Sequence, residues 1–152
     1  MDTTEYLDEI QKAAKGEVLG ELLFLRLSTR YGVEHSHKLE CLAALERCTA
    51  DCMKRLLARH KISVENFDDA EEFTDKLIET SPLESWTDFV SWMHNIVDPY
   101  IALYDRLALA AGAEDKQDLE FLAAHERALL NFLNAEMRGA DNSLAPVRAL
   151  LC

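Results

Sequence analysis

The segment LAAHERALLN, residues 122–131, has the composition of a helix buried in a protein core, yet a histidine and a glutamate stand at its centre. At about 100° per residue, His125 falls in the middle of the apolar stripe that Leu122 and Leu129 define, and Glu126 falls at its edge. Ionisable groups at such a depth must be paired, protonated or bound to a cation, because desolvating a lone charge is costly. The role of this segment therefore depends on what other helices bring to the same depth.

The composition predicts one folded, all-α domain over residues 1–152. The chain is 49% hydrophobic and 29% charged, as expected for a sequence that folds around a single core. Its five glycines and three prolines leave long stretches without a helix breaker.

The charge balance narrows the classes of partner. With 28 acidic and 16 basic residues, the formal charge is −12, which disfavours nucleic acids and anionic membrane surfaces. No apolar run is long enough to cross a membrane, and the start MDTTEYLDEI lacks the features of a secretory signal. We expect a cytoplasmic protein whose four cysteines are free thiols in a reducing compartment: Cys41, Cys48, Cys52 and Cys152.

Helix start and stop signals divide the chain into four long helices, at about 3–31, 35–60, 82–111 and 114–138. Asp2 and Ser81 are the expected N-caps of the first and third, and Gly32, Gly112 and Gly139 are the expected stops. Short turns make the first two helices antiparallel neighbours, and likewise the last two.

A long connection separates the second helix from the third. We expect a short helix near residues 67–79 within it, and another short helix after Gly139. A connection of this length can run along a bundle and make the second and third helices parallel, the alternative being a simple up-down-up-down order.

Carboxylates lie among the apolar residues of the first two helices. Glu17 and Glu21 are one turn apart on the first, Glu46 lies within the core stripe of the second, and Thr49 follows one turn later. Counted from the turns, Glu21, Glu46 and His125 all fall near mid-height of the bundle. The third helix offers the phenol of Tyr100 at that depth and no core-facing carboxylate.

Three segments carry a resemblance to the ferritin-like superfamily, rubrerythrins included: GEVLGELLF at residues 16–24, LAALERCT at 42–49 and AAHERALLNFLNAEMRG at 123–139. The resemblance implies a four-helix bundle with carboxylate and histidine ligands inside it. Two positions depart from the pattern, because Thr49 stands where a histidine would follow Glu46 and Leu122 stands where a glutamate would precede His125. The resemblance therefore carries over only Glu21, Glu46 and His125 as ligand positions.

Two hypotheses for function follow. In the first, Glu21, Glu46 and His125 bind iron, manganese or zinc, with Glu17 and Glu126 as substitute ligands. The hydroxyls of Tyr100 and Thr49 would be supporting hydrogen-bond partners of this metal site, which could be redox-active.

In the second hypothesis the same cluster holds no metal, and the bundle binds a protein partner or a small apolar ligand. No nucleophile motif, phosphate-binding glycine loop or H-E-x-x-H sequence is present, which excludes the common hydrolase and nucleotide-binding classes. The apolar breadth of the first helix, through Leu19, Leu23 and Leu27, suggests a homodimer surface. The sequence does not indicate whether the protein is an enzyme.

Overall fold

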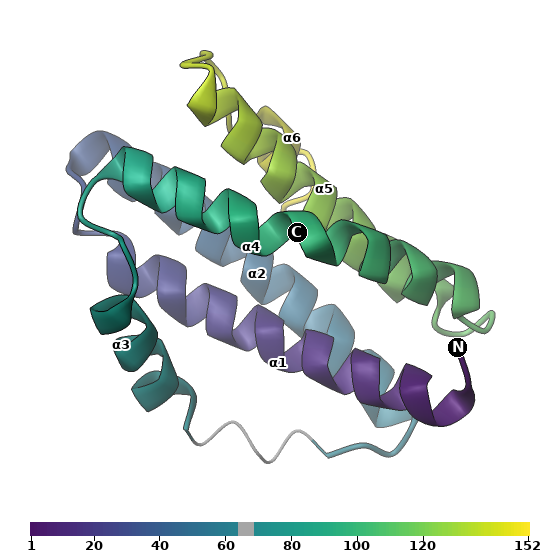
Figure 1. Cartoon of the computed structure of the whole chain (residues 1–152). Helices are drawn as coiled ribbons and strands as arrows, with labels where there is room; N and C mark the ends of the chain where they lie inside the picture. Colours follow the sequence, from purple (N-terminus) through teal and green to yellow (C-terminus); the bar gives the residue numbers. More distant parts are fainter. Residues whose placement is uncertain (64–68) are drawn as a thin grey trace.

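A computed structural model describes residues 1–63 and 69–152, and regular structure in this part of the chain is helical, without strands. The helices are α1 (Thr3–Leu27), α2 (Val33–Arg59), α3 (Ala70–Thr80), α4 (Trp86–Ala110), α5 (Lys116–Met137) and α6 (Ala145–Arg148). Figure 1 shows the four long helices lying alongside one another, with α3 beside α1. The all-α prediction is confirmed. The predicted short helix near 67–79 corresponds to α3, except that residues 67 and 68 lie outside the described residues.

The N-terminal cap of α1 lies where the sequence places it. The Asp2 side chain accepts a hydrogen bond of 2.8 Å from the backbone N–H of Glu5. The helix ends at Leu27 rather than at residue 31, and the chain then turns through Gly32, whose φ of 92° suits a residue without a side chain.

The predicted start of α4 is wrong by one turn. The helix begins at Trp86 rather than at residue 82, and Ser85, not Ser81, forms a capping box with Asp88. The reason is tertiary: Leu83 is buried, and its carbonyl accepts a 2.7 Å hydrogen bond from the Tyr31 hydroxyl. These contacts hold the segment as a turn against the end of α1.

Polar contacts at the two ends of the bundle fix the helix directions. The Tyr6 hydroxyl donates to Asp115 at 2.8 Å, so α1 and α5 begin at the same end. Lys38 Nζ lies 2.6 Å from Glu136 Oε1, so α2 begins where α5 ends. Because α4 precedes α5 through a short turn, α2 and α4 run in the same direction (Figure 1). The parallel arrangement is confirmed, and the up-down-up-down alternative is excluded.

The apolar interior forms two clusters along the bundle. One surrounds Phe24, Phe89 and Phe132, and the other surrounds residues such as Ile10 and Met53. Between them, each long helix except α4 contributes a buried polar side chain, as described below. This layer divides the core at mid-height.

The apolar residues of α1 are used within one chain. Leu23 and Leu27, which suggested a homodimer surface, are 5% and 1% exposed and belong to the core, while Leu19 is only half-buried. These two leucines are therefore not available as a dimer surface, and the homodimer stays a prediction.

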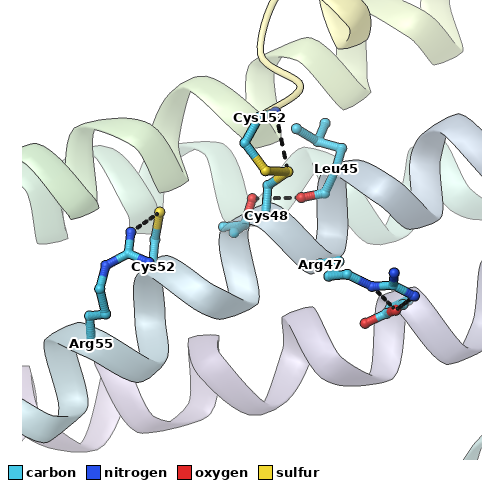
Figure 2. The surroundings of a disulfide bond; sticks show 8 residues. Leu45, Arg47, Cys48, Cys52, Arg55 and Cys152 are labelled. Atoms are coloured by element: carbon cyan, nitrogen blue, oxygen red, sulfur yellow. Dashed lines mark hydrogen bonds and ion pairs between the residues drawn. A yellow bond between two sulfur atoms is a disulfide. The ribbon is translucent and has the colours of Figure 1, made fainter.

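The free-thiol prediction is wrong for two of the four cysteines. Cys48 on α2 is bonded to Cys152, with their Cα atoms 6.1 Å apart (Figure 2). The chain after α5 folds back so that α6 packs on α5 and α2, which brings the last residue to α2. Cys41 and Cys52 are free. None of the described helices has the length and apolar character needed to cross a membrane.

Candidate metal centre

Three ionisable side chains from three helices meet in the polar layer. Glu17 of α1, Glu46 of α2 and His125 of α5 are 3%, 4% and 1% exposed. His125 Nδ1 lies 3.0 Å from Glu17 Oε2, and His125 Nε2 lies 3.3 Å from Glu46 Oε1. One ligand atom from each residue falls within 4.8 Å of the others, which is close enough for small side-chain movements to bring them around one cation. Glu46 and His125 lie together at mid-height as the sequence predicts, whereas Glu17 occupies the position expected for Glu21.

Hydrogen bonding within this cluster is incomplete. Glu17 Oε2 and His125 Nδ1 face each other at 3.0 Å, yet neither atom makes a hydrogen bond of acceptable geometry. Buried polar atoms in folded proteins almost always have a partner, such as another side chain, an ordered water or an ion. The two atoms therefore form an ion pair without a well-directed hydrogen bond.

Burial and mutual charge set the protonation of the cluster. Burial raises the pKa of Glu46, the neighbouring Glu17 carboxylate raises it further, and the result lies well above its ordinary value. Burial also opposes the charge of Glu17, but the positive His125 outweighs this effect and lowers the pKa of Glu17. Burial opposes the charge of His125, but the two glutamates together raise the pKa of His125 well above its ordinary value. These shifts favour the positive charge of His125 and the negative charge of Glu17, and they disfavour the negative charge of Glu46.

Glu126 adds a third acid beside the cluster. It is 6% exposed, and among the described residues it has no hydrogen-bond or ion-pair partner. Burial raises the pKa of Glu126, His125 lowers it and Glu17 raises it, which gives a value of about 7.

A cavity of about 420 Å³ between α1 and α4 reaches the cluster. Glu17, Glu46 and Glu126 lie along it, and apolar side chains of α4 such as Met93 and Val97 form part of its wall. Sites for small ligands are commonly concave and apolar, with a few polar groups that orient the ligand. This cavity has that composition.

Gly20 is a site residue that the sequence analysis missed. A Cβ added to Gly20 would lie 2.8 Å from Glu46 Oε2, closer than real Cβ contacts, so the glycine makes room for the Glu46 carboxylate. A Cβ on Gly16, one turn earlier, would meet nothing within 4 Å. Two glycines one turn apart inside a helix were the available signal, because glycine weakens a helix unless something packs against it.

The structure does not bring Glu21 into the cluster. Glu21 Oε1 lies 2.6 Å from Arg47 Nη2 on the outer side of α1 and α2, and Glu17 takes the inner position instead. The expectation that Glu21 belongs to the cluster is therefore wrong. Glu17, which was named as a substitute for it, takes that position.

The two expected supporting hydroxyls also lie elsewhere. Thr49 is buried, but its hydroxyl donates to the carbonyl of Leu45, one turn back, at 3.0 Å. Tyr100 is 43% exposed and lines the cavity, with its ring 5.7 Å from that of Tyr104. Tyr104 is the more buried phenol of the pair at 5% exposed, and burial raises its pKa.

A second buried acid, also missed, joins three helices at the end of the bundle. Asp115 is 4% exposed, and it accepts hydrogen bonds from Tyr6 at 2.8 Å and from Arg59 at 3.1 Å, with the His60 ring in contact as well. Burial raises the pKa of Asp115, but the contacts with His60, Tyr6 and Arg59 outweigh it, and the pKa is lowered. No sequence spacing links these residues, which are brought together by the packing of α1 and α2 against the turn before α5.

Comparisons of the chain with protein-family models, with curated proteins and with solved structures found no match.

Proposed function

We propose that this protein is a metal-binding helical bundle of the ferritin-like kind, which holds one metal ion between Glu17, Glu46 and His125. The observation that carries the proposal is the convergence of three buried ligand groups from three helices, with one atom of each within 4.8 Å. The single long connection between the parallel helices α2 and α4 supports the ferritin-like assignment.

The ligand set favours iron, manganese or zinc. Carboxylate oxygens and an imidazole nitrogen suit hard and borderline divalent ions, and thiolate-binding ions have no sulfur ligand here. With the imidazole neutral and both glutamates ionised, the site would balance the charge of a divalent ion. Three protein ligands leave coordination positions open, and the cavity beside α4 would give a small molecule access to them. A redox-active ion would supply electron transfer to such a molecule.

The test is the metal content of protein purified without chelators and without a nickel column. Elemental analysis should find about one ion per chain in the wild type. Glu46→Gln and Glu17→Gln should lose the ion, because each removes a charged ligand with little change in shape. Glu21→Gln is the matched control on α1, since Glu21 pairs with Arg47, and it should retain the metal.

A metal-free polar cluster is the second candidate. It is favoured by the position of His125, whose two ring nitrogens each face a glutamate, at 3.0 and 3.3 Å. Under this alternative the purified protein contains no stoichiometric metal, and its melting temperature does not respond to added iron, manganese or zinc. That pair of results would contradict the metal proposal.

A further inference from the structure

The lining of the cavity between α1 and α4 has an acidic part and an apolar part. Its inner part presents the carboxyl groups of Glu17, Glu46 and Glu126, and its wall presents side chains such as Met93, Val97 and Leu129. The lining residues include one basic group, Lys12, which is exposed and paired with Asp8 at 2.7 Å. The cavity is therefore apolar along its length and acidic at its base.

One carboxyl group at the base of the cavity, that of Glu126, lacks a partner among the described residues. Glu17 Oε2 lies 3.0 Å from His125 Nδ1, whereas Glu126, 6% exposed, has no hydrogen-bond or ion-pair partner among the described residues. Ionised carboxylates only accept hydrogen bonds, so a ligand that satisfies them has to donate. An anionic ligand would instead be repelled and would leave the same oxygens unpaired.

We infer that the metal-free protein binds a small organic cation in this cavity, an alkylammonium or arylalkylammonium ion whose ammonium group lies against Glu126 and whose apolar body lies along α4. An ammonium group offers three N–H donors to the Glu126 carboxyl group, which has no other donor among the described residues, and such charge-assisted bonds are about twice as strong as neutral ones. The inference goes beyond the proposed metal site, because it concerns the cavity and does not use His125.

The wall of the cavity suits the rest of such a ligand. A volume of about 420 Å³ falls in the range of small-molecule sites. Tyr100 and Tyr104 line the cavity with their rings 5.7 Å apart, and aromatic faces attract organic cations. Aliphatic side chains of α4 and α5 provide contact for an alkyl chain.

Three ligands with one tail and different head groups test this inference. Hexylammonium, hexan-1-ol and hexanoate share a six-carbon chain and differ in charge, so calorimetric titration of chelator-treated protein isolates the head group. We expect one hexylammonium ion per chain, bound about tenfold more tightly than hexan-1-ol, with hexanoate weakest. Glu126→Gln should remove most of the preference for the ammonium and leave binding of the alcohol unchanged.

A substitution that fills the mouth of the cavity distinguishes binding inside the cavity from nonspecific attraction to the acidic surface of the protein. Gly16 lines the cavity, and a Cβ there would meet nothing within 4 Å, so Gly16→Leu should fill the entrance without disturbing α1. This variant should lose hexylammonium binding, whereas Gly16→Ala should keep it. The inference would be overturned by equal affinity for the three head groups or by no measurable binding of hexylammonium. It would also be overturned if Gly16→Leu bound hexylammonium as tightly as the wild type. None of these titrations depends on whether the purified protein contains metal.

Discussion

At the scale of single residues, the geometry of the site depends on a glycine. The Glu46 carboxylate occupies the space where a side chain on Gly20 would begin, with 2.8 Å between a Cβ at that position and Glu46 Oε2. Glycine inside a helix costs roughly 1 kcal/mol relative to alanine, and Gly20 has a packing reason to be there. Gly16 is one turn away on the same helix without such a contact, which makes the two positions a matched pair.

We predict that Gly20→Ala lowers metal affinity although it removes no ligand. The added methyl group should displace the flexible end of Glu46 from His125 and reduce zinc affinity about tenfold or more, as measured by competition with a chromophoric chelator. Gly16→Ala should leave affinity unchanged and raise stability by up to about 1 kcal/mol. Equal zinc affinity in the two variants would show that the position of Glu46 does not matter for the metal.

The protonation of the cluster predicts how metal affinity depends on pH. A metal ion must displace the proton of His125 and that of Glu46, and the pKa values of both groups are raised. Affinity should therefore increase with pH and continue to increase above 6.5, where a free imidazole is already neutral. Each displaced proton contributes about tenfold per pH unit. Zinc titrations between about pH 6 and about pH 8 in buffers of different ionisation enthalpy measure the protons released. A pH-independent affinity would contradict the site.

The sequence identified Glu46 and His125 as partners but gave Glu21, rather than Glu17, as the third member of the cluster. The two glutamates are one turn apart, about 40° in rotation, so both fall on the apolar side of α1. The choice depends on Arg47, which lies next to Glu46 and binds Glu21 across the α1–α2 interface. A helical projection of one element contains no information about that neighbour.

At the scale of elements, the ends of the helices are held by buried polar contacts rather than by capping alone. Asp115 ties α1, α2 and the start of α5 through Tyr6, Arg59 and His60. The sequence predicted which helices exist and which run in parallel, because periodicity and connection length are local properties. It misplaced the start of α4, because the contact of Leu83 with Tyr31 is tertiary.

We predict that Asp115→Asn destabilises the protein by about 2 kcal/mol at neutral pH, the usual cost of losing hydrogen bonds to a charged group. Because the pKa of Asp115 is lowered on folding, its contribution is present above the ordinary value of 3.8 and is lost as pH falls through the folded value. The difference in melting temperature between the variant and the wild type should therefore shrink in acid.

Asp118→Asn provides the control for this prediction. Asp118 also pairs with Arg59, but its side chain is 15% exposed and does not contact Tyr6 or His60. A stability loss as large as that of Asp115→Asn would mean that the ion pair with Arg59, and not the three-helix contact, holds this end. Thermal unfolding followed by circular dichroism measures both variants.

At the scale of the whole molecule, a polar layer interrupts an otherwise continuous apolar core. The two hydrophobic clusters lie on either side of Glu17, Glu46 and His125. Replacing a buried group of charges with apolar residues often leaves stability equal or improves it, whereas removing one member leaves an unpaired charge. A layer that does not stabilise the fold is retained for a different purpose, and this distinction can be measured.

We predict that the combined variant Glu17→Leu, Glu46→Leu and His125→Leu folds with a melting temperature equal to or above that of the metal-free wild type, and binds no metal. The single variant Glu46→Leu should instead lose about 3 kcal/mol, because it leaves His125 with one buried partner. Denaturant unfolding of the chelator-treated proteins measures the free energy of unfolding of the wild type, the combined variant and Glu46→Leu. If the combined variant fails to fold or unfolds without cooperativity, the layer specifies the register of the helices, and the metal-free alternative gains support. If it folds stably and has lost the metal, the layer is a binding site within a bundle that would be at least as stable without it.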